Sequence, residues 1–101
     1  MQHLLALINQ VFEIEQRLTD QEQFANFERN FKRINAIFES EGFLCINPMG
    51  EKYMESRTDC EASIVGSNLA DLKISKVIKP IIYKVENGTN TLVQKGIVIA
   101  S

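Results

Sequence analysis

The chain has 101 residues, of which 45% are hydrophobic and none is tryptophan, and its formal net charge is -2. This length suits one small domain, or a helical part and a β part that share a boundary. The charge is spread over both halves, so it gives no footprint for nucleic acid or for an anionic membrane surface. No stretch predicts a membrane span, and the N-terminus does not resemble a secretion signal.

Two apolar stripes predict helices in the first part of the chain. In both stripes the residues recur at steps of three and four, the spacing of one side of an α-helix. The first stripe comprises Leu4, Leu7, Val11, Ile14 and Leu18, and the second comprises Phe24, Phe27, Phe31, Ile34 and Phe38. The stripes are out of phase, so one straight helix could not present both to one partner.

A turn between the two stripes is expected at Thr19-Asp20-Gln21-Glu22, because a Thr followed three places later by Glu can cap a new helix start. The second helix should then run from about residue 20 to residue 41. Gly42 should end it, since glycine accepts the left-handed C-cap conformation without a Cβ penalty. We therefore expect a helical hairpin over residues 1–41, the dimerisation segment, and a β domain for partner binding over residues 42–101.

The hairpin alone cannot surround both stripes, so something else must cover them. Two hairpins could bury the stripes against each other in a dimeric four-helix bundle, with the ten stripe residues as the dimer interface. The alternative is that the stripes pack against the β part of the same chain.

The β part should be small and mainly antiparallel, which makes the fold class α+β. Strands are predicted over residues 43–46, 60–65, 72–78, 81–85 and 91–100, and Asn87-Gly88 should join the last two as a hairpin. Pro80 cannot donate a ladder hydrogen bond, so the neighbouring residues 76–79 should be irregular.

Catalytic chemistry has few candidates in this sequence. His3 is the only histidine, and it lies at the frayed start of a helix. Cys45 and Cys60 match neither a disulfide scaffold nor a metal site, and we interpret them as reduced and cytoplasmic. An enzyme that uses either thiol as a nucleophile would need an abnormally low thiol pKa. We therefore expect no enzyme, no catalytic residue, no metal and no cofactor.

A polar constellation precedes the second predicted strand. If the chain is extended here, alternating residues share one side, and the set contains Tyr and Arg, which are enriched at protein interfaces. One interpretation is a solvent-facing strand surface, and the other is a recognition edge for a protein partner. The partner-binding candidates are Tyr53, Glu55, Arg57, Asp59 and Glu61, and Glu51 belongs to the same constellation.

The order of these parts resembles the GrpE-type nucleotide exchange factors, and short matches accompany it. Residues 4–9 are similar to the Leu-Leu-Pro-Val-hydrophobic-Asp stretch of that family, and residues 31–46 to its passage from bundle into β domain. Residues 50–53 resemble its Gly-Glu-x-Phe motif, residues 61–65 its Glu-Ala-hydrophobic segment, and residues 96–100 its last strand.

Several family features are missing. The Asp-Pro-x-x-His motif is replaced by residues 54–60, and the long N-terminal stalk helix is absent. The Gly-Tyr and Arg-Pro-Ala features are also missing, with residues 80–83 and 94–96 in their neighbourhood.

The resemblance implies a cytoplasmic co-chaperone without a cofactor. Its homodimer would bind the nucleotide-binding domain of a DnaK-type chaperone through the β domain and promote ADP release. Binding to nucleic acid or to a membrane is not expected. The alternative is a dimeric protein-protein adaptor that has this architecture but a different partner and no exchange activity.

Overall fold

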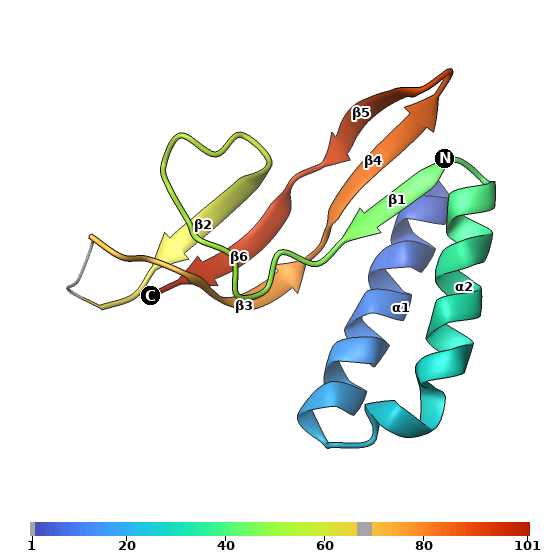
Figure 1. Ribbon diagram of the computed structural model, residues 1–101, viewed down its shortest axis with the longest axis horizontal. Helices are drawn as coiled ribbons and strands as arrows, with labels where there is room; N and C mark the ends of the chain where they lie inside the picture. Colours follow the sequence, from blue (N-terminus) through green and yellow to red (C-terminus); the bar gives the residue numbers. More distant parts are fainter. Residues whose placement is uncertain (1, 67–69) are drawn as a thin grey trace.

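The computed structural model describes residues 2–66 and 70–101, and its fold is α+β, as predicted (Figure 1). The helical part consists of α1 (Gln2–Asp20), a short 3-10 helix η1 (Phe24–Phe27) and α2 (Glu28–Ser40). The described strands are β1 (Phe43–Ile46), β2 (Cys60–Ile64), β3 (Ile74–Lys79), β4 (Ile81–Glu86), β5 (Thr89–Gln94) and β6 (Gly96–Ala100). Figure 1 shows α1 and α2 lying side by side as a hairpin, with β1 leading from it into the β part.

The turn between the helices differs from the prediction. The Thr19 hydroxyl donates to the Glu15 carbonyl at 2.8 Å, inside α1, so it does not cap a second helix. Glu22 adopts a left-handed φ of 59°, and the Gln23 amide donates to the Leu18 carbonyl at 2.8 Å. This arrangement closes the C-terminus of α1. The predicted helix start near residue 20 is therefore wrong, and helical structure resumes only at Phe24.

Gly42 ends the hairpin as predicted. Its φ is 86°, and its amide donates to the Glu39 carbonyl at 2.9 Å. A Cβ atom at this position would also lie 3.2 Å from the Val85 carbonyl oxygen, while the Val85 amide donates to the Gly42 carbonyl at 2.8 Å. The helix end and the start of β1 are thus tied to β4 at a point where only glycine fits without strain.

The strands form two three-stranded sheets, with orders β1-β4-β5 and β2-β6-β3. All pairs are antiparallel except β2 and β6, which are parallel. β4 and β5 meet at Asn87-Gly88, where both residues have positive φ, so the predicted hairpin is confirmed.

The predicted last strand over residues 91–100 is wrong in one respect, because it is two strands that separate at Lys95. Pro80 separates β3 from β4 at the same level. The register of β3 against β6 shifts between Ile74 and Lys76 and between Val77 and Lys79, which confirms the irregularity expected beside Pro80. The ribbon of β3–β4 and β5–β6 therefore bends and changes sheets at Pro80 and Lys95 (Figure 1).

Two apolar clusters hold the helices to the sheets. In one, Ile8 and Phe38 from the helices are buried with Phe43 and Ile82 from the first sheet. In the other, Phe12 of α1 is buried among strand residues such as Val77 and Val98. The helical part before Gly42 and the β part after it are therefore packed together, since each cluster contains residues from both parts.

Candidate functional site

The polar constellation before β2 is not extended along one strand, so the condition under which its residues would share one side is not met. Only Glu61 belongs to a strand, β2. Residues 50–53 run beside the start of β3, where the Gly50 amide donates to the Ile74 carbonyl at 2.9 Å and the Tyr53 amide to the Leu72 carbonyl at 2.9 Å. Residues 54–59 then form a turn and loop. Because the segment is not one extended strand, alternating residues do not share one side of it.

Arg57 binds its own loop. Its Nε donates to Asp59 Oδ1 at 2.8 Å and its Nη2 to Asp59 Oδ2 at 3.1 Å, a bidentate pair. The same Nη2 lies 3.1 Å from Glu51 Oε1, and Nη1 donates to the Lys52 carbonyl at 3.2 Å. Only 19% of the Arg57 side chain is exposed. The guanidinium thus holds the loop together and has little surface left for a partner.

The electrostatics of this cluster agree with its geometry. The hydrogen bond from Arg57 holds the pKa of Asp59 below its usual value, and the bond to Asp59 raises the pKa of Arg57. The pair therefore keeps both charges at neutral pH.

Neither cysteine has the environment of an activated thiol. Burial, assisted by the charge of Glu15, raises the pKa of Cys45 to about 11. Burial also raises the pKa of Cys60, which belongs to the core cluster around Phe12. Nucleophilic chemistry requires a shift in the opposite direction.

The other predicted partner-binding residues are scattered. Tyr53 is half-buried and packs against the core cluster around Phe12. Glu55 is exposed, and Glu61 lies 3.8 Å from the Lys95 ammonium in an exposed ion pair. The structure brings Arg57 and Asp59 together, but it does not combine all five residues into one recognition edge.

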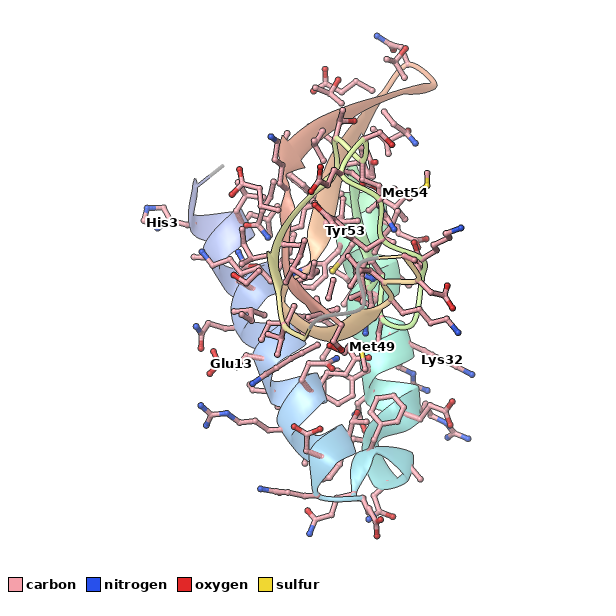
Figure 2. All side chains as sticks on the ribbon, turned by 90° about the vertical axis from the view of Figure 1, so that its left-hand side faces the viewer. His3, Glu13, Lys32, Met49, Tyr53 and Met54 are labelled. Atoms are coloured by element: carbon pink, nitrogen blue, oxygen red, sulfur yellow. The ribbon has the colours of Figure 1, made fainter. Side chains whose placement is uncertain are left out.

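Exposed apolar residues near this loop were not found from the sequence. Met54, Ile64 and Val65 are 53%, 39% and 57% exposed. A cleft of about 400 Å³ is lined by Met54 and Ile64 together with Tyr53 and Leu72. Figure 2 shows Met54 at the outside of the molecule and Tyr53 within the outline of the β part. In the sequence Met54 stands between Tyr53 and Glu55, outside any periodic apolar pattern, so periodicity does not detect it.

The ten residues predicted for the dimer interface divide into covered and outward-facing members. Phe31 and Phe38 are buried within the chain, and Phe24 stacks on Phe31 with ring centroids 5.7 Å apart. Three residues, Leu7, Ile14 and Phe27, are 53%, 52% and 42% exposed. The remaining members are half-buried: Leu4, Val11, Leu18, Phe24 and Ile34.

The buried members of the stripes show that part of this apolar surface packs against the β part of the same chain. Phe38 packs with Phe43 and Ile82, so that part of the second stripe lies against the chain's own first sheet. Along α1 the half-buried and exposed members alternate, which leaves Leu7 and Ile14 on the outer side of the stripe. Ile37 of α2, outside the predicted stripe, is 60% exposed.

The residues that hold α1 to the sheets were missed by the stripe analysis. Ile8 and Phe12 are the buried residues of α1, and Leu5 packs beside Ile8. These three follow the same helical spacing, one residue after Leu4, Leu7 and Val11. The sequence of α1 therefore contains two adjacent stripes, and the prediction covers only the outer one.

Comparison with known proteins gave no match among protein-family models, curated proteins or solved structures. Within residues 2–66 and 70–101, no helix has the length and apolar character to cross a membrane. Within the same ranges, no group of three or more His, Cys, Asp or Glu side chains is placed to hold a metal ion.

Proposed function

We propose that this protein is a homodimeric, GrpE-like co-chaperone that promotes ADP release from a DnaK-type chaperone. The observation that carries the proposal is the joining of a helical hairpin, with apolar residues left on its outer side, to a small β part at Gly42. This is the order of parts in the resemblance described above. The proposed location is the cytoplasm, where Cys45 and Cys60 would stay reduced.

The outward residues of the hairpin support the dimer. Leu7 and Ile14 lie two helical turns apart on α1, while Phe27 at the end of η1 and Ile37 on α2 are also exposed. Exposed large apolar residues on both helices of one hairpin suit a second copy, because two hairpins can enclose them in a four-helix bundle. Figure 2 shows the charged side chains of Glu13 and Lys32 pointing away on opposite sides of the hairpin.

A contact between two motif positions also supports the proposal. Asn9 stands where the resembling family motif has Asp, and Gln94 stands in the neighbourhood of its Arg-Pro-Ala feature. In this chain Asn9 Nδ2 donates to Gln94 Oε1 at 2.8 Å, and Gln94 Nε2 donates to Asn9 Oδ1 at 2.9 Å. The two amides therefore join the stretch that resembles the opening of the family's bundle to the end of β5.

The mechanism requires no bond to be made or broken. The β part would bind the open form of the chaperone's nucleotide-binding domain more tightly than the closed form, and only that difference in affinity can shift the chaperone toward release. With Arg57 and Asp59 bound to each other, we propose that Met54, Glu55 and Tyr53 beside the cleft make the contact. Methionine suits such a surface because its side chain is flexible and polarisable.

The test measures the release of a fluorescent ADP analogue from the cognate DnaK-type chaperone. Faster release in the presence of the protein is expected, and Met54→Asp should abolish the acceleration. Met49→Asp is the matched control, because Met49 is 54% exposed and does not line the cleft. Binding without acceleration would favour the adaptor function. If the protein does not bind the chaperone even at a large molar excess, the proposal is overturned.

A further inference from the structure

The bend of the β ribbon leaves backbone groups that need a partner. Pro80 and Lys95 interrupt both strands of the ribbon at the place where it passes from one sheet to the other. The Pro80 carbonyl accepts a hydrogen bond from Gln94 Nε2 at 2.9 Å. Gln94 therefore connects the two interrupted strands across the bend.

The same Gln94 side chain binds α1. Its amide and the amide of Asn9 exchange two hydrogen bonds, of 2.8 and 2.9 Å, across 85 positions of sequence. Asn9 Nδ2 also donates to the Leu5 carbonyl at 3.0 Å, which fixes the Asn9 side chain on its own helix. Each of the two amide nitrogens thus makes two hydrogen bonds, its full donor capacity.

A bulge in β5 lies next to Gln94. Ile82 pairs with Gln94 and the following Tyr83 pairs with Leu92, so Val93 is an extra residue in β5. A bulge changes the direction of neighbouring side chains relative to a regular strand. Here the bulge residue Val93 precedes Gln94, whose side chain contacts α1.

After Phe12, α1 separates from the second sheet, β2-β6-β3. A cleft of about 570 Å³ lies between the later turns of α1 and strand β3, and its lining includes Gln16, Arg17, Lys76 and Ile78. Phe12 is the last residue of α1 that is buried. Packing along the outer half of the helix therefore does not determine its angle to the sheet.

We infer that Asn9 and Gln94 are positioning residues that set the angle between the helical hairpin and the sheet β2-β6-β3. Ile8 packs α1 against the first sheet, and Phe12 is its buried contact with the cluster that contains the second sheet. Apolar packing of this kind is non-directional. The amide pair adds a directional connection at the bend between the two sheets. This role is independent of the proposed exchange activity, because the angle is a property of the free protein. In a dimer built on the hairpins, it would determine the direction in which each β part projects.

The test uses residual dipolar couplings of backbone amides in the full-length protein, fitted separately for the helices and for β2, β3 and β6. In the wild type, both sets should fit one orientation. In Gln94→Met, which keeps a similar length and removes the hydrogen bonds, the relative orientation of the two sets should shift. Asn9→Asp combined with Gln94→Arg should return it toward the wild-type value, because a guanidinium can donate two parallel hydrogen bonds to a carboxylate and so reconnect β5 with α1.

Gln10→Met is the matched control, since Gln10 is an exposed amide on α1 that lines the same cleft. It should leave the orientation unchanged. If Gln94→Met does not fold, Asn9→Ser breaks the same pair from the helix side. A wild-type orientation in the folded variant would overturn the inference, even if its stability fell.

Discussion

The helical hairpin and the polar constellation around Arg57 were both expected to meet a partner, and they differ in how far their side chains already make contacts within the chain. Arg57 in the loop binds Asp59, Glu51 and a backbone carbonyl. Leu7 and Ile14 on the hairpin remain more than half exposed. The comparison shows that an interface-like residue type indicates a docking surface only if its own neighbours leave it available.

The largest effect is expected for the inner side of the hairpin. Phe12→Ala should reduce the free energy of unfolding by about 3–5 kcal/mol, because it removes a buried ring and leaves a cavity. Phe27→Ala is the control, since Phe27 is 42% exposed. Denaturant unfolding of both variants at one protein concentration measures the difference. Equal losses would contradict the division of the hairpin into a buried and an outward side.

The loop provides the second test. Arg57→Ala should reduce the free energy of unfolding by about 1–3 kcal/mol, because the carboxylates of Asp59 and Glu51 lose their charged hydrogen-bond donor. Thermal or denaturant unfolding checks the value against Glu55→Ala, an exposed neighbour that should change little. Unchanged stability in Arg57→Ala would return Arg57 to the list of residues available for a partner.

The same cluster predicts a pH dependence. The pKa of Asp59 is lower in the folded protein than the ordinary value of 3.8, so its ionisation stabilises the fold fully above that value. The contribution is lost as the pH falls below 3.8 and through the folded-state pKa. Acid unfolding should therefore remove less stability from Asp59→Asn than from the wild type. Identical loss between pH 5 and pH 2 would contradict the Arg57–Asp59 assignment.

Much of the fold was readable from local patterns. β1 begins and ends at the predicted residues, Gly42 and Asn87-Gly88 have the predicted conformations, and the irregularity beside Pro80 is present. These features depend on backbone rules that act over a few residues.

The errors concern contacts between residues far apart in sequence. The Asn9–Gln94 pair joins positions that no periodicity relates, and the split of the last strand at Lys95 depends on a sheet change that its sequence does not signal. For the candidate site, the sequence identified Arg57 and Asp59 as two of five partner-binding candidates. It did not indicate the loop in which they bind each other, because the geometry of that loop depends on backbone pairing with residues 72–74.

The smallest effect is expected at the helical turn. Glu22→Gly should raise the free energy of unfolding by up to about 1 kcal/mol, because Glu22 holds a φ of 59° that glycine adopts more easily. Gln21→Gly, in the same turn but without a positive φ, should give no gain. Equal changes in both variants would show that the left-handed conformation of Glu22 carries no cost.

The measurement that tests the central claim most directly is sedimentation equilibrium of the wild type and of Leu7→Lys combined with Ile14→Lys. Phe31→Asp would not serve, since Phe31 is buried within its own chain and the substitution would unfold it. The control adds the same charges at the exposed turn, as Gln21→Lys with Gln23→Lys. The account predicts a dimeric wild type and control, and a folded monomer for the Leu7 and Ile14 variant. A monomeric wild type at micromolar concentrations would contradict it.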